Sequence, residues 1–84
     1  MNPRPVQVEP LENYELLVTF QYGERRIFDV KPLLCKPLYA ALKNKAFFRL
    51  AKADGMCVYW NDEVDLCPDM TYTDSRPVQQ ECAG

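Results

Sequence analysis

The 84-residue chain is 48% hydrophobic and 26% charged, which is typical of one small folded domain and excludes a disordered composition. Ten basic residues against twelve acidic ones give a net charge of −2, which argues against a general nucleic-acid binder, since such domains are normally strongly basic. No stretch approaches the roughly 20 apolar residues of a membrane span, and the N-terminus lacks an apolar signal region, so we expect a cytoplasmic protein with no membrane partner.

The first thirty residues predict three antiparallel strands. Residues 6–9 alternate apolar and polar side chains between Pro5 and Pro10, with Leu11 just beyond, which is typical of a short strand at a sheet edge. Residues 14–21 are the clearest strand, with Leu16, Val18 and Phe20 on one face, and should lie in the centre of the sheet. Residues 22–24 predict a turn whose glycine takes a positive φ, and residues 25–30 return as the hairpin partner of the central strand.

A short motif, apolar-Asp-apolar-x-Pro, occurs at residues 28–32 and again at residues 64–68. The aspartate can accept a hydrogen bond from the backbone N–H two residues later, and the proline holds the residue before it in an extended conformation. Each copy should therefore end a strand and begin a short helix. The structural turn residues are then Asp29, Pro32, Asp65 and Pro68. The repeat predicts an α+β fold, a small β-rich domain of two strand-turn-strand units that each end in an Asp-x-x-Pro turn and a short helix.

The segment between the two copies contains a helix signal and a hairpin signal. Residues 37–42 hold good helix formers behind a proline and predict a short helix. Residues 46–53 fit either a helix or a strand by their period. Asp54-Gly55 is a strong turn signal, and residues 56–60 are rich in strand formers, so we interpret residues 46–53 as the partner strand of a second hairpin.

These elements define the domain organisation. Residues 1–5 are expected to be a flexible N-terminus and residues 6–75 a single globular α+β domain. The chain becomes polar after Ser75, so residues 76–84 should form a flexible C-terminal tail.

The four cysteines are expected to be reduced thiols, because no secretory signal accompanies them. Three of them stand among apolar residues and should pack as small core side chains, whereas the fourth falls in the predicted tail. The chain contains no Cys-x-x-Cys pair and no histidine, so we expect neither a structural metal nor a cofactor. The cysteines are Cys35, Cys57, Cys67 and Cys82.

Gly23-Glu24 ahead of Phe28-Asp29, followed by Trp60 ahead of an Asp-Leu-x-Pro motif at residues 65–68, resembles the bacterial family catalogued as domain of unknown function 2442. The resemblance covers roughly residues 6–73. It implies a small intracellular α+β protein, often encoded beside another small protein and sometimes joined to a helix-turn-helix domain. Such contexts are similar to toxin–antitoxin or regulatory modules. The resemblance implies no catalytic residue.

Carboxylates are the only candidates for acid–base chemistry, because the chain lacks histidine and has no phosphate-binding loop or nucleophile elbow. Each carboxylate has a structural explanation: two as turn caps, one as a charge at a helix start and two in a polar turn. They are Asp29, Asp62, Glu63, Asp65 and Asp69. We therefore expect a non-enzymatic protein.

A protein-interaction or regulatory module, antitoxin-like in the family context, is the function that the sequence favours. Several aromatic residues exceed what one small core needs, and they are candidates for contacts with a partner protein, with the product of a neighbouring gene as the specific candidate. The alternative for two of them, adjacent in one strand, is that at least one is a core residue. A homodimer through an edge strand is a further option. The candidate residues are Tyr22, Tyr39, Tyr59, Trp60 and Tyr72.

A nucleic-acid-binding accessory protein is the alternative function. A basic strip interleaved with two phenylalanines could follow a phosphate backbone while the rings stack on bases. The competing interpretation places both phenylalanines in the core and leaves the basic residues as an ordinary solvated face. The basic strip consists of Lys43, Lys45, Arg49 and Lys52.

Overall fold

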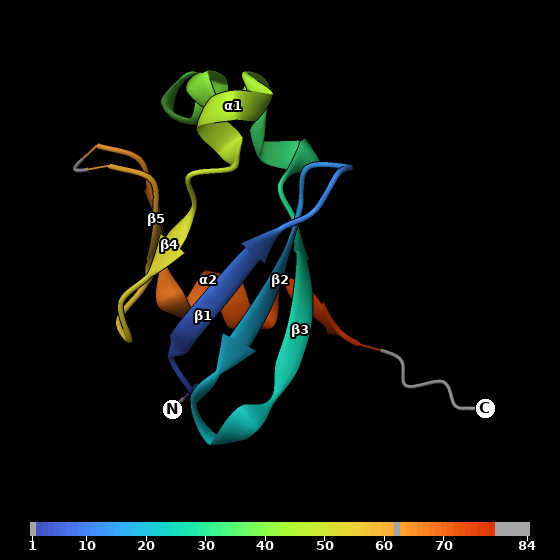
Figure 1. The fold of residues 1–84 in the computed structure, drawn as a ribbon, viewed down its shortest axis with the longest axis vertical. Helices are drawn as coiled ribbons and strands as arrows, with labels where there is room; N and C mark the ends of the chain where they lie inside the picture. Colours follow the sequence, from blue (N-terminus) through green and yellow to red (C-terminus); the bar gives the residue numbers. More distant parts are fainter. Residues whose placement is uncertain (1, 62, 79–84) are drawn as a thin grey trace.

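Two antiparallel sheets lie side by side in the computed structural model, which describes residues 2–61 and 63–78 (Figure 1). The larger sheet has the strand order β1-β2-β3-β7, and its strands are β1 (Pro5–Pro10), β2 (Glu15–Phe20), β3 (Arg25–Asp29) and β7 (Ser75–Pro77). The smaller sheet has the order β4-β5-β6, and its strands are β4 (Lys52–Ala53), β5 (Val58–Tyr59) and β6 (Asp65–Leu66). The predicted α+β class is confirmed.

Within the described ranges, five short helical segments connect and cover the strands. Three are 3₁₀ turns: η1 (Gln21–Gly23), η2 (Lys31–Leu33) and η3 (Pro37–Lys43). The two α-helices are α1 (Lys45–Phe48) and α2 (Pro68–Thr73). Helix α2 passes behind the larger sheet in Figure 1, while α1 and η3 lie together at one end of the molecule.

Strand β2 is central and β1 is an edge strand, as the sequence predicts. Register places Leu16 of β2 opposite Phe28 of β3, and alternation sends Leu16, Val18 and Phe20 to one face. These three side chains are fully buried. The core thus lies between this face of the larger sheet, the smaller sheet and the helices. Its remaining buried apolar residues are Phe28, Val30, Leu42, Phe48, Val58, Trp60, Val64 and Leu66.

The repeated Asp-x-x-Pro motif ends a strand in both copies, but only the first aspartate acts as expected. The backbone N–H of Lys31 donates to Asp29 Oδ1 at 3.0 Å, and η2 begins at once. Helix α2 begins at Pro68, the first helical position. Asp65 is exposed, and its side chain makes no hydrogen bond to another described residue. The second turn therefore depends on its proline alone.

The Asp54-Gly55 hairpin is confirmed, whereas its first strand is much shorter than predicted. Asp54 Oδ1 accepts hydrogen bonds from the N–H groups of Met56 and Cys57, and Gly55 has φ +86°. The prediction of a strand over residues 46–53 is wrong. Asn44 Oδ1 accepts from the N–H groups of the first helical turn and caps α1 in place of that strand.

Both predicted flexible ends extend less far than expected. Pro5 is the buried first residue of β1. The chain after Ser75 continues as β7, in which Arg76 pairs with Ile27 of β3. The rest of the predicted tail, residues 79–84, lies outside the described residues.

The prediction of three core cysteines is wrong. Cys35 and Cys67 are exposed, and Cys57 is half-buried. All three are free thiols. Cys67 directly precedes α2 and Cys35 lies in the turn between η2 and η3, so their apolar sequence neighbours do not enclose them. Cys82 lies outside the described residues.

Candidate partner-binding groove along strand β1

Trp60 is a core residue and does not belong to a binding surface. Its ring is 5% exposed, and its indole N–H donates to the Phe48 carbonyl oxygen at 2.9 Å. Tyr59, the residue before it, is half-buried at the end of β5. At least one of the adjacent pair is thus core, which confirms the alternative that the sequence left open.

The remaining predicted aromatic residues do not form one patch. Tyr39 is half-buried against the core, and its hydroxyl donates to the Asp65 carbonyl oxygen at 3.3 Å. Burial raises the pKa of that hydroxyl, and the Asp65 charge adds to the effect. Tyr72 packs edge-on against Phe20. Tyr22 alone among the five is freely exposed, at 95%.

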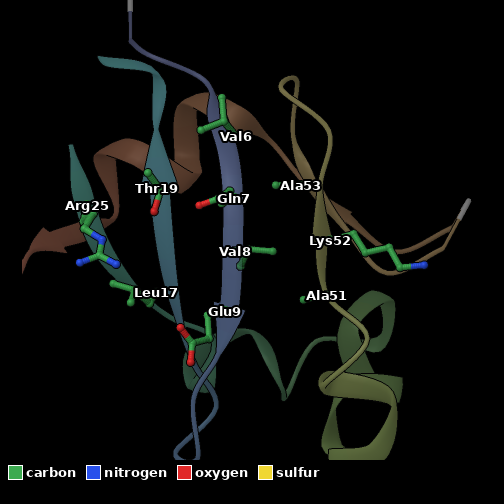
Figure 2. Close-up of a pocket in the computed structure, with 10 residues that line it drawn as sticks. All are labelled: Val6, Gln7, Val8, Glu9, Leu17, Thr19, Arg25, Ala51, Lys52 and Ala53. Carbon is green, nitrogen blue, oxygen red and sulfur yellow. The ribbon is translucent and has the colours of Figure 1, made fainter. Parts of the chain in front are cut away.

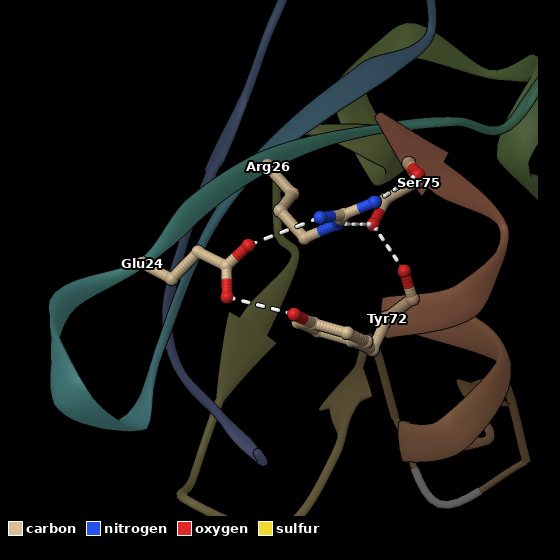
Figure 3. Close-up of polar contacts among 4 residues, drawn as sticks. All are labelled: Glu24, Arg26, Tyr72 and Ser75. Atoms are coloured by element: carbon tan, nitrogen blue, oxygen red, sulfur yellow. Dashed lines mark hydrogen bonds and ion pairs between the residues drawn. The ribbon is translucent and has the colours of Figure 1, made fainter. Parts of the chain in front are cut away.

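Tyr72 belongs to a polar clamp, defined here as Glu24, Arg26, Tyr72 and Ser75 (Figure 3). Arg26 Nε donates to Ser75 Oγ and Nη2 to the Ser75 carbonyl oxygen, both at 2.7 Å. Glu24 accepts from the Tyr72 hydroxyl at 2.8 Å and from Arg26 at 3.0 Å. The Arg26 guanidinium also lies over the Tyr72 ring. The clamp joins β3, α2 and β7, and its polar groups are already partnered, so its role is structural.

The basic strip is exposed, but its interleaved aromatic residues are not available. Phe48 is buried and Phe47 packs against the core, which confirms the core interpretation of both rings. Lys45 lies over the Tyr14 ring at 5.8 Å from its centroid. Without an exposed ring the strip has no platform on which bases could stack.

A groove of about 420 Å³ runs along β1, between the edge of the larger sheet and β4 (Figure 2). Val8 extends from β1 toward β4, Ala51 and Ala53 lie on the facing side, and Lys52 extends away from β1. Within the described residues β1 pairs only with β2, and β4 pairs only with β5. β1 and β4 nevertheless lie close beside each other, so the groove follows two neighbouring strands that do not pair with one another. The full lining is Val6, Gln7, Val8, Glu9, Leu17, Thr19, Arg25, Ala51, Lys52 and Ala53.

Two further hollows continue the groove toward α1. One, of about 450 Å³, shares Glu9 with the groove and is also lined by Pro10, Leu11, Glu12 and Arg49. The other, of about 220 Å³, shares Leu11, Glu12 and Arg49 with it. The three depressions form one surface along β1, which we call the β1 groove. Lys45 and Arg49 border its α1 end, and so part of the predicted basic strip belongs to it.

The β1 groove presents a concave surface and backbone hydrogen-bonding groups, and few side chains that could take part in catalysis. It holds apolar side chains and a mixture of acidic and basic residues on its rim. Across residues 2–61 and 63–78, no three potential ligands among histidine, cysteine, aspartate and glutamate come together as a metal site would require. No helix in the same ranges has the length and apolar character needed to cross a bilayer.

Sequence reasoning missed this groove because its two walls are more than forty residues apart in the chain. Pro5 and Pro10 did mark β1 as an edge strand. Nothing in the sequence indicated that β4 would lie beside it, since β4 is only two residues long.

A family model described as protein of unknown function, DUF2442, matches residues 5–77. The match extends from the first residue of β1 to the last residue of β7, so it covers both sheets and both α-helices. No curated protein and no solved structure matched the chain. This chain is therefore a member of the DUF2442 family.

Proposed function

We propose that this chain is a non-enzymatic module that binds a partner protein along the β1 groove. The observation that carries the proposal is the groove along β1, which is lined by two neighbouring strands, β1 and β4, that do not pair with each other. An extended polypeptide can hydrogen-bond to a free strand edge while its alternate side chains enter neighbouring pockets. Val6, Val8 and Ala53 supply the apolar contacts for such side chains.

A protein partner is favoured over a nucleic acid by the charges of the groove. Arg49 and Lys45 would attract phosphates at the α1 end. Glu9 and Glu12 line the same surface and would repel them. A lining that mixes polar groups, apolar side chains and charges of both signs suits a polypeptide, whereas a phosphate backbone needs consistent positive charge.

The role of the module is regulatory and antitoxin-like, in the cytoplasm, with the product of a neighbouring gene as its specific partner. The family context stated above supports this part of the proposal. Self-association through a strand edge and binding of nucleic acid by the basic strip are the competing outcomes of the test.

The test compares two exposed apolar residues, one inside the groove and one outside it. Val6 lines the groove and is 38% exposed, whereas Leu38 on η3 is 57% exposed and lines none of the three depressions described above. Tagged wild-type protein should recover a stoichiometric protein from cells of its source. Val6→Glu should lose that protein, and Leu38→Glu should retain it. Recovery of the chain alone, or equal recovery by both variants, contradicts the proposal.

A further inference from the structure

We propose that Tyr22, at the tip of the β2–β3 hairpin, is a rigid anchor that inserts into an apolar pocket on the partner protein. The inference rests on the proposed function, since it requires that the chain binds a protein. It adds a second contact surface that lies outside the β1 groove.

The backbone conformation of Tyr22 is strained, and contacts of its side chain with the rest of the chain do not offset this strain. Tyr22 has φ +70° and ψ +9°, and Gly23 follows with φ +87°. Two successive residues at positive φ favour Asn-Gly in a hairpin, because a side chain such as tyrosine is strained in the left-handed region. The ring of Tyr22 is 95% exposed, so packing within the chain offsets almost none of that strain.

Tyr14 is a second tyrosine with a strained backbone, but its side chain makes contacts within the fold. It also has a positive φ, of +57°, at the β1–β2 turn. Its ring packs edge-on against Phe48 with 5.2 Å between centroids, and its hydroxyl donates to the Lys43 carbonyl oxygen. The fold therefore holds Tyr14 in place through its side chain. No comparable contact within the described residues holds Tyr22, which indicates that the ring serves a contact with another molecule.

The base of the Tyr22 hairpin is fixed on both sides. The N–H of Phe20 donates to the Glu24 carbonyl oxygen at 2.7 Å, and the N–H of Gln21 donates to the Arg4 carbonyl oxygen at 2.9 Å. The Glu24 side chain belongs to the polar clamp that reaches α2 and β7 (Figure 3). A short turn on so fixed a base loses little conformational entropy on binding, which suits an aromatic anchor.

The hairpin lies at the end of the β1 groove that Val6 occupies. Thr19 and Arg25 line the groove and flank the hairpin by one or two residues on either side. A partner seated along β1 would therefore reach the tip. Tyrosine is enriched among the few residues that dominate protein interfaces, because it buries a large ring and keeps a polar hydroxyl at its end. The receiving site should be a pocket with apolar walls and a hydrogen-bonding group at its floor.

Site-specific cross-linking tests the anchor in cells of the source organism. The photoreactive residue p-benzoylphenylalanine replaces Tyr22, Gln7 in the groove, or Leu38 on η3 in three separate variants. We expect one discrete protein adduct from positions 22 and 7 and none from position 38. An adduct from position 7 but not from 22 overturns the anchor and leaves the proposed function standing. Adducts from neither position overturn both. An adduct at 22 with a second copy of the chain or with nucleic acid also overturns the anchor.

The substitution Tyr22→Asn separates binding from folding. It creates the Asn-Gly pair that the turn favours, so the melting temperature should rise by a few degrees. Cross-linking identifies the partner protein, which is then purified without the cross-link. The affinity of Tyr22→Asn for this partner should fall about 30-fold relative to the wild type, as expected for loss of an aromatic hot spot. Tyr22→Phe, which keeps the ring, should retain most of the affinity. An unchanged affinity in Tyr22→Asn contradicts the anchor, and loss of affinity in a variant with a raised melting temperature cannot come from unfolding.

Discussion

Trp60, which directly follows β5, links the smaller sheet to helix α1 through a single side chain. Its ring lies 6.3 Å from that of Phe48, centroid to centroid, and its N–H satisfies the Phe48 carbonyl oxygen where α1 ends. The same oxygen also accepts from the Ala51 N–H at 3.3 Å, so the indole supplies the shorter of two hydrogen bonds to this carbonyl. Trp60 therefore supplies both apolar burial and a hydrogen bond to the core.

Replacement of this ring should destabilise the domain strongly. Trp60→Ala removes a large buried ring and one of the two donors to the Phe48 carbonyl, so we expect a loss of about 3–5 kcal/mol of unfolding free energy. Urea unfolding followed by far-UV circular dichroism measures it, with the exposed Met56→Ala as the control. A Trp60→Ala variant with the wild-type midpoint would contradict the assignment of Trp60 to the core.

Burial of individual aromatic residues could be predicted only in part. Alternation in β2 correctly identified the three buried side chains of that strand, since six residues give a clear period. Strand β5 is only two residues long. The sequence therefore predicted that Tyr59 and Trp60 lie on opposite faces, but it did not show which face belongs to the core. The exposure of Tyr22 follows from the geometry of its turn, which sequence alone did not resolve.

At the scale of elements, α1 shows a local cap that overrides a strand pattern. Asn44 has extended φ and ψ, and its Oδ1 accepts hydrogen bonds from the N–H groups of Ala46 and Phe47 at 2.9 and 3.3 Å. These donors have no partner within the helix, so the cap decides where it begins. The hairpin signal at Asp54-Gly55 was correct, but the assumption that its first strand must fill the whole preceding segment was not.

The cap should be worth about 1 kcal/mol to the domain. Asn44→Ala leaves the two N–H groups to water and should lower the unfolding free energy by that amount, whereas Asn44→Asp, which keeps an acceptor at the same position, should retain most of it. Chemical denaturation of the three proteins measures the difference. Equal destabilisation by the alanine and aspartate variants would show that the oxygen of Asn44 does not cap α1.

Strand β7 was missed because its stabilisation comes from contacts distant in sequence. The strand is three residues long and contains a proline, and its partner β3 lies about fifty residues earlier. Neither a period nor a turn signal identifies such a strand. The Arg26–Ser75 hydrogen bonds, which fix β7 against β3, join side chains that no local pattern connects.

At the scale of the whole molecule, the polar clamp makes the stability of the fold sensitive to acid. Hydrogen bonds from Tyr72 and then from Arg26 hold the pKa of the Glu24 carboxyl below its usual value of 4.5. A carboxyl whose pKa is lower in the folded chain stabilises the fold above its unfolded pKa, and this stabilisation is lost as the pH falls through the folded pKa. The clamp should therefore loosen in acid.

Two variants test the acid sensitivity. The urea midpoint of the wild type should fall more than that of Glu24→Gln between about pH 6 and about pH 3, because the variant has no carboxyl to protonate at this position. Tyr72→Phe removes the hydrogen bond that lowers the Glu24 pKa most. Its urea midpoint should therefore depend on pH less than that of the wild type and more than that of Glu24→Gln. Parallel pH curves for the wild type and Glu24→Gln would contradict the role of the clamp.

The β1 groove forms only when the whole chain is folded, because strands of both sheets line it. The sequence predicted an edge strand and a partner-binding role, and it placed the binding residues on scattered aromatic side chains. The structure leaves Tyr22 as the one freely exposed residue of that set and adds the groove beside it. The β1 groove runs from the α1 end of the molecule to the end where the β2–β3 hairpin turns, so one partner can contact both surfaces.

Calorimetric titration of the purified partner into wild type, Val6→Glu and Leu38→Glu tests the groove most directly. Both variants add one negative charge at an exposed apolar position, so they match in chemistry and differ in location. If the partner binds in the β1 groove, Val6→Glu should weaken the affinity at least about tenfold and Leu38→Glu should leave the affinity unchanged. Equal affinities for all three proteins, or a loss confined to Leu38→Glu, would contradict it.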